Sequence, residues 1–107
     1  MASSHYNLTC AYICTYNTVV FEWDKAKAKQ NEKKHRILFS DTFAVFEDPN
    51  ALTLDQVVRG EERYVTIGMD CFGRILVVVY TWRGETMRII SARKATRSEV
   101  SQYEGEI

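Results

Sequence analysis

Four polar residues in the first third of the chain have the spacing of one helix face. Lys27, Asn31, Lys34 and His35 would form a single stripe along a helix over residues 25–35. Histidine titrates near neutral pH and suits proton transfer, while lysine supplies positive charge. The stripe is typical either of a reactive site or of a solvated surface with the histidine packed at the helix end, and spacing alone leaves both open.

Three arginines fall in segments that are otherwise rich in Val, Ile and Ala. Arg63, Arg88 and Arg93 lie within or at the ends of predicted strands. A charged head on a sheet face must meet water, a carboxylate or a phosphate, and the guanidinium fork matches phosphate oxygens with paired donors. One such arginine indicates a salt bridge, whereas three from neighbouring strands are typical of salt bridges or of an anion site in about equal measure.

Other familiar chemistries have no motif here. The sequence has no Gly-x-Ser-x-Gly elbow, no phosphate-binding glycine loop and no histidine pair at metal spacing. Cys10, Cys14 and Cys71 do not have the paired spacing of a zinc site. We therefore expect no metal and no cofactor, and any catalysis would depend on Lys, Arg, His and Glu.

The charge is balanced in total but not in distribution. The 107 residues, enough for one domain, carry 14 basic and 14 acidic side chains and no net charge. Most basic residues fall between positions 25 and 36 or between 83 and 97, while the acids lie mostly elsewhere. This segregation predicts a basic face suited to nucleic acid, although charge runs alone more often indicate solvated surfaces.

The hydrophobic pattern predicts an α+β fold. After a short strand near residues 19–21, Asp24 caps the helix over 25–35 and a shorter helix follows before Pro49. Strands are expected over 51–54, 63–69, 75–80 and 87–92, with the third of these central. Thr96 and Glu99 have capping-box spacing and predict a closing helix.

These elements define the expected architecture. The strands would form an antiparallel meander, and the two N-terminal helices and the C-terminal helix would leave one sheet face open. Residues 1–17 lack Lys, Arg, Asp and Glu and are interpreted as a flexible N-terminal extension, with the functional domain spanning residues 18–107. No stretch is long and apolar enough to span a membrane.

Several motifs in order resemble one family. The segments at 21–24, 27–39, 60–68, 73–79 and 88–99 are similar to BrnT-type toxins, including Phe21-Glu22-Trp23-Asp24 and Arg88-Ile89-Ile90-Ser91-Ala92-Arg93. The resemblance covers about residues 19–105. It implies a RelE-like fold and a cytoplasmic type II toxin that cleaves mRNA and so inhibits translation, without a metal ion.

The resemblance also implies site residues and partners. By position it indicates Lys34, His35, Arg63 and Arg93 as catalytic, with RNA binding assisted by a further set: Lys27, Arg88 and Arg97. The expected partners are the RNA substrate and a BrnA-type antitoxin in a two-plus-two complex, with operator DNA bound only through the antitoxin.

One position departs from the family pattern, and two other functions stay open. Arg36 stands where the family usually has a glycine that ends the helix, so the end of the helix and His35 can be placed differently from the family pattern. The same basic face would also suit a nucleic-acid-binding module without catalysis, which predicts binding that weakens steeply with salt. A domain that only docks an acidic protein would instead show no affinity for RNA.

Overall fold

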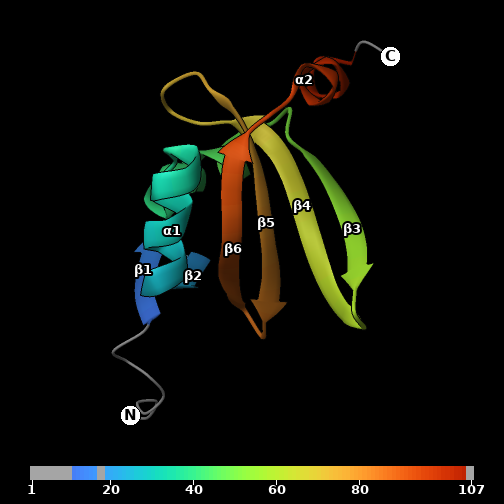
Figure 1. The fold of residues 1–107 in the computed structure, drawn as a ribbon. Coiled ribbons are helices and arrows are strands. Elements are labelled where there is room, and N and C mark those ends of the chain that lie inside the picture. The colour runs from blue at the N-terminus through green and yellow to red at the C-terminus, as the bar shows by residue number, and fades with distance from the viewer. Residues whose placement is uncertain (1–10, 17–18, 106–107) are drawn as a thin grey trace.

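The computed structural model describes residues 11–16 and 19–105, which form one mixed sheet with helices at its edge and ends (Figure 1). The strands are β1 (Ala11–Tyr16), β2 (Val19–Asp24), β3 (Leu52–Val58), β4 (Glu61–Met69), β5 (Ile75–Arg83) and β6 (Thr86–Lys94). The helices are α1 (Lys25–His35), the 3-10 helix η2 (Phe39–Glu47) and α2 (Arg97–Tyr103). The strand order is β1-β2-β6-β5-β4-β3. The prediction of an α+β fold is confirmed.

The meander prediction is correct for four strands and wrong for the sheet as a whole. Strands β3 to β6 are joined in sequence by hairpins and pair antiparallel. Strand β2 instead pairs parallel to β6, through Val20 with Thr86 and Glu22 with Arg88. The sheet is mixed because the long connection through α1 and η2 leads from β2 to β3 at the far edge, and the three hairpins that follow bring β6 back beside β2 in the same direction.

The predicted extension contains a strand. Ala11–Tyr16 pairs antiparallel with β2 and adds an edge to the sheet, although its sequence shows no clear period. The interpretation of residues 1–17 as a flexible extension therefore fails for these six residues, and the remainder of that range lies outside the described part of the chain. The strand is specified by backbone pairing with β2, which a pattern of side chains does not reveal.

The two sheet faces carry separate apolar clusters. The larger cluster joins β2, β5 and β6 to η2 and to the segment after α1, with Phe21 and Phe43 at a ring-centroid distance of 4.4 Å. The smaller cluster lies on the other face and consists of Val65, Ile67 and Val77, against which Tyr103 of α2 packs. Helix α2 therefore covers one end of the face that the sequence predicted to be open, and the helices do not share one face.

The second predicted helix is present as a 3-10 helix. It contributes Phe39, Phe43 and Val45 to the larger cluster, and Phe46 packs against that cluster. It lies so close to β4 that a Cβ atom on Gly68 would be 2.9 Å from Val45 Cγ1. Glycine is thus required at position 68 by the approach of η2.

Helix α1 begins and ends where the sequence indicates, although Arg36 replaces the expected glycine. Asp24 accepts hydrogen bonds from the backbone N–H groups of Ala26 and Lys27. At the other end Arg36 takes the left-handed conformation, with φ 62°, and its N–H donates to the Glu32 carbonyl oxygen. His35 is therefore the last helical residue, and Arg36 ends the helix at an energetic cost that glycine would not have.

The Arg36→Gly variant is expected to raise the free energy of unfolding by about 1 kcal/mol, because glycine adopts positive φ without the Cβ clash. Urea denaturation of purified protein measures the change. Arg36→Ala is the matched control, since it removes the same side chain but keeps the Cβ atom and should give no gain. Equal stabilities for the two variants would show that the conformation of residue 36 carries no strain.

Within the described residues, no helix has the length and apolar character needed to cross a membrane.

Candidate active site

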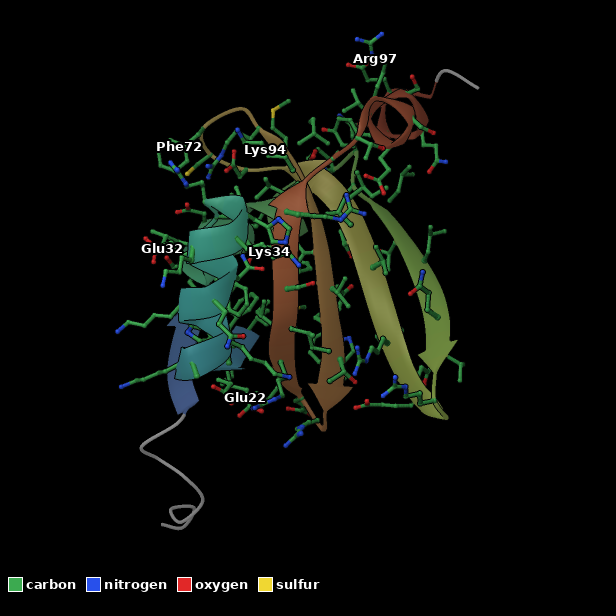
Figure 2. All side chains as sticks on the ribbon, in the orientation of Figure 1. Glu22, Glu32, Lys34, Phe72, Lys94 and Arg97 are labelled. Carbon is green, nitrogen blue, oxygen red and sulfur yellow. The ribbon has the colours of Figure 1, made fainter. Side chains whose placement is uncertain are left out.

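A groove separates α1 from the adjacent strand β6. It has a volume of about 250 Å³. Ile90 and Ser91 of β6 line one side, and five residues of α1 line the other: Lys27, Gln30, Asn31, Lys34 and His35. Lys34 lies on the side of α1 that faces β6 (Figure 2). The predicted polar stripe thus faces a concave surface, and three of the predicted site residues, Lys27, Lys34 and His35, share it.

The strand side of the groove is formed at an irregularity in β6. Tyr80 of β5 pairs with Ile89 and Val79 pairs with Ser91, so Ile90 is an extra residue between them. Such a β-bulge bends the strand and changes the direction of its side chains. Here it brings Ile90 and Ser91 to the groove, while Ile89 stays buried in the larger core cluster.

Asn31 fastens α1 to β6 and is a structural residue. Its side-chain amide donates to the carbonyl oxygens of Ile37 (3.0 Å) and Ala92 (2.8 Å), and its Oδ1 accepts from the Ala92 N–H (3.0 Å). The side chain is buried, so these bonds replace water at three backbone groups. Asn31 therefore fixes the distance between the two walls of the groove.

The Asn31→Ala variant is expected to lower the free energy of unfolding by about 2–3 kcal/mol, because buried backbone groups lose their partners. Gln30 on the same helix is exposed, and Gln30→Ala is expected to change the free energy of unfolding by no more than about 0.5 kcal/mol. Urea unfolding of both variants gives the comparison. A loss for Asn31→Ala no larger than that for Gln30→Ala would contradict the fastening role.

Arg93 lies on β6 two residues beyond Ser91 and is held by α2. Its Nη1 and Nη2 atoms each donate to a Glu99 carboxylate oxygen at 2.8 Å, and Nη1 also contacts the Lys94 carbonyl oxygen. The bond from Arg93 is the largest cause that lowers the pKa of Glu99 to about 2, so the pair is ionised at neutral pH. No described residue accepts a hydrogen bond from Nε of Arg93, which leaves this donor for a ligand.

Glu99 performs two tasks with one carboxylate. It completes the predicted capping box by accepting from the Thr96 N–H, while Thr96 Oγ1 accepts from the Glu99 N–H. The same carboxylate orients Arg93. The capping box predicted from the sequence is therefore confirmed, and it also positions a candidate site residue.

Stability is expected to depend on Glu99 at acidic pH. Because folding lowers the pKa of this carboxyl from 4.5 to about 2, the pair stabilises the fold above pH 4.5 and loses its contribution as the pH falls toward 2. The measurement is urea unfolding of wild type and Glu99→Gln at several pH values over that range. The gap between the two proteins should narrow as the pH falls, and a gap that is independent of pH would contradict the assignment.

A second bond docks α2 on the sheet. The Tyr103 hydroxyl donates to Asp48 Oδ2 at 2.6 Å, and the same carboxylate accepts from the Met69 and Asn50 N–H groups. Burial raises the pKa of Asp48, but the bond from Tyr103 and the two backbone bonds outweigh it and leave the pKa lowered. Helix α2 therefore has polar anchors at both ends.

The structure does not bring Arg63 together with Lys34 and His35. Arg93 is opposite Val77 of β5, and Val77 is opposite Ile67 of β4. Arg63 is on β4 four residues before Ile67. It is on the same sheet face as Arg93 but roughly 13 Å along the strands and 10 Å across them from Arg93. Sequence order could not show this separation, because it depends on strand register.

The two remaining predicted residues also lie outside the groove. Arg88 is on β6, where its Nη1 donates to Glu22 Oε2 at 3.1 Å. Arg97 is exposed on α2, and its side chain points away from the sheet (Figure 2). Of the predicted set, Lys27, Lys34 and His35 thus line the groove, and Arg93 lies on β6 two residues beyond the groove residue Ser91.

Two larger hollows lie on other sides of α1. One, of about 390 Å³, is lined by apolar residues such as Trp23, Leu38 and Phe39. The other, of about 740 Å³, is lined by Lys29, Lys33 and other exposed helix residues. Neither contains a histidine, so we place the candidate site in the smaller groove. In the described part of the chain, no three His, Cys, Asp or Glu side chains are close enough to hold a metal ion.

Two features of this site have no signal in the sequence that identifies them. Nothing in the sequence marks Ile90 as an extra residue in its strand, because a bulge is defined only against a partner. The link from Glu99 to Arg93 spans six positions around the end of β6 and has no periodic signal. The capping-box spacing identified Glu99 as a helix residue but not as the partner of Arg93.

The geometry defines a small α+β protein with a cationic, histidine-containing groove, and comparisons with known proteins agree on its class. The family described as "Ribonuclease toxin, BrnT, of type II toxin-antitoxin system" matches residues 23–99. The crystal structure of the Brucella abortus ribonuclease toxin BrnT is similar, with 27% sequence identity and a TM-score of 0.59 over 70% of this chain and 94% of that one. No curated protein sequence matches the chain.

The family match spans most of the chain, including α1, β6 and the groove between them. The chain belongs to the BrnT family of ribonuclease toxins of type II toxin–antitoxin systems. The family resemblance inferred from the sequence motifs is confirmed.

Proposed function

We propose that this protein is a metal-independent endoribonuclease that cleaves mRNA in the groove between α1 and β6 and thereby inhibits translation. The observation that carries the proposal is the grouping of Lys27, Lys34 and His35 against the bulge at Ile90 and Ser91. The groove offers a titratable side chain and positive charge in one concave place, which is what phosphodiester cleavage requires.

The proposed reaction uses the RNA itself as the nucleophile. The 2′-oxygen attacks the adjacent phosphorus as its proton leaves, the bond to the 5′-oxygen breaks, and that oxygen gains a proton. The products are a 2′,3′-cyclic phosphate and a free 5′-hydroxyl. His35 is the proposed group for one of the two proton transfers, and Lys34 is the second candidate because it lines the same groove.

Arg93 is the proposed ligand of the reacting phosphate. His35 lies one helical turn beyond Asn31, and Arg93 lies one residue beyond Ala92, to which Asn31 is bonded. Since α1 and β6 run in the same direction (Figure 1), His35 and Arg93 are at the same end of the groove. Glu99 holds the Arg93 guanidinium in place, and its Nε remains to donate to the developing negative charge.

The fold superfamily, the cellular location and the protein partner are proposed from the family. We propose a RelE-like superfamily fold, action in the cytoplasm, and neutralisation by a BrnA-type antitoxin in a two-plus-two complex that alone binds operator DNA. The antitoxin is expected to cover the cationic groove and, on the edge strand β3 three strands away from β6, the exposed apolar side chains of Leu52 and Leu54.

Controlled expression in a bacterial host tests this proposal. Induction of the chain alone should stop growth and fragment mRNA, and co-expression of a cognate antitoxin should prevent both effects. Growth arrest with intact mRNA would contradict the nuclease proposal. Mobility-shift measurements with RNA then separate a non-catalytic RNA-binding module, which binds without cutting, from a protein-docking domain, which does not bind.

A further inference from the structure

Arg63 and Arg88 lie on either side of one strand. Arg88 is directly opposite Thr81 of β5. On the other side of β5, Tyr64 is opposite Tyr80, and continuing this register by one residue places Arg63 beside Thr81. The Thr81 hydroxyl donates to the Glu62 carbonyl oxygen at 3.0 Å, so β4 and β5 are still adjacent at this level. The two arginines are therefore about two strand spacings apart, close to 10 Å between Cα atoms.

Both arginines point to the same face as the groove residues of β6. Arg63 is two residues from Val65, and Thr81 is two residues from Val79, so side-chain alternation places them on the face of the smaller apolar cluster. Ser91 and Arg93 are opposite Val79 and Val77 and share that face. One continuous surface along β5 therefore joins the Arg63–Arg88 pair to the groove.

The distance between these positions is too large for one phosphate group. Thr81 is four residues from Val77, the partner of Arg93, which corresponds to roughly 13 Å along the strand. Arginines at the two ends of this surface would therefore contact different phosphates of one strand. Positively charged groups placed along a nucleic-acid backbone are the usual way in which a protein fixes the register of the strand.

Neither arginine of the pair has its donors fully used. Arg63 Nη2 contacts Glu61 at 3.3 Å, while its Nε is buried and has no hydrogen-bond partner among the described residues. Arg88 contacts Glu22 through Nη1 alone, at 3.1 Å, which leaves its other donors without a partner among the described residues. A buried donor without a partner is costly, so a shift of the Arg63 side chain that lets Nε donate to a phosphate oxygen would be favourable.

We infer that Arg63 and Arg88 form a second phosphate-binding subsite, separate from the reacting phosphate, and that the substrate is a single-stranded RNA segment of several nucleotides lying along β5. The inference rests on the proposed nuclease function and specifies its substrate. In-line attack by the 2′-oxygen requires a flexible backbone, which a single strand has and a stacked duplex lacks. The subsite binds and positions the RNA and takes no part in bond cleavage.

The test compares two substrates and four proteins. The substrates are a dinucleoside monophosphate, which has only the reacting phosphate, and an octanucleotide with several phosphates. The proteins are wild type, Arg63→Ala, Arg63→Lys and the charge-matched control Lys29→Ala on another face of α1. Binding of an uncleavable octanucleotide with a 2′-deoxy backbone, measured by fluorescence anisotropy at several salt concentrations, gives a readout independent of cleavage.

Wild type should cleave the octanucleotide with a higher kcat/KM than the dinucleoside monophosphate. Arg63→Ala should reduce kcat/KM about tenfold for the octanucleotide alone, and Arg63→Lys less, because lysine keeps the charge without the fork. The slope of the logarithm of the binding constant against the logarithm of the salt concentration should become shallower by about one in Arg63→Ala but not in Lys29→Ala.

An equal loss on both substrates would assign Arg63 to the reacting phosphate and overturn the second subsite, as would an unchanged octanucleotide rate in a folded Arg63→Ala protein. If wild type cleaves neither substrate but binds the uncleavable strand through Arg63, the nuclease proposal fails while the subsite stands. If it neither cleaves nor binds, both fail.

Discussion

The His35→Ala variant is expected to cleave RNA about 100- to 10,000-fold more slowly than wild type, the usual contribution of a positioned acid or base. The variant loses the histidine of the groove, whereas the other lining groups of α1 and β6 remain. His35 is the last residue of α1 and is half-buried, so its removal should leave the helix and its cap in place. The measurement is kcat/KM on a labelled oligoribonucleotide, together with urea unfolding.

Two companion variants make this result specific. His35→Gln keeps side-chain volume and hydrogen bonding without titrating near neutral pH, so it should be as slow as His35→Ala. Lys29→Ala removes one exposed positive charge from the same helix outside the groove and should retain the wild-type rate. A folded His35→Gln protein with wild-type activity would show that proton transfer is performed by another group, with Lys34 the next to examine.

Replacement of Arg93 by alanine is expected to slow cleavage about 100-fold, equivalent to about 3 kcal/mol of lost transition-state stabilisation. Arg93 lies on β6 two residues beyond the groove residue Ser91, and Glu99 orients its guanidinium through two bonds of 2.8 Å. The loss should fall mainly on kcat, because charge on the phosphate increases as the phosphorane forms.

Glu99→Gln separates this chemical role from a structural one. Both Arg93→Ala and Glu99→Gln weaken the link between β6 and α2, but only the first removes the guanidinium. We expect Glu99→Gln to remain within a few-fold of wild-type activity. Equal losses in the two variants would contradict a role of the Arg93 guanidinium that is independent of its pairing with Glu99.

The features that the sequence predicts correctly are local ones. The Asp24 cap, the end of α1 at His35 and the Thr96–Glu99 box depend on residues within one helical turn. The central position of β5 followed from its unbroken apolar run. These features are specified by neighbouring residues, and patterns of neighbouring residues are what a sequence displays directly.

The features that the sequence did not predict depend on pairing between segments that are distant in the chain. The parallel pairing of β2 with β6, the strand at Ala11–Tyr16 and the extra residue Ile90 are defined by partners distant in sequence. The same applies to the candidate site. The helix stripe that supplies Lys34 and His35 was visible in the sequence, but strand register alone places Arg93 two residues from the groove residue Ser91 and Arg63 two strands away from β6.

The chemistry of the cleaved ends tests the central proposal most directly. Purified protein is incubated with a defined oligoribonucleotide in the presence of a metal chelator, and the fragments are analysed by mass spectrometry. The account predicts cleavage under these conditions, with 2′,3′-cyclic phosphate and 5′-hydroxyl ends that are absent with His35→Ala. Fragments with 5′-phosphate ends, or cleavage that stops when the chelator is added, would contradict it.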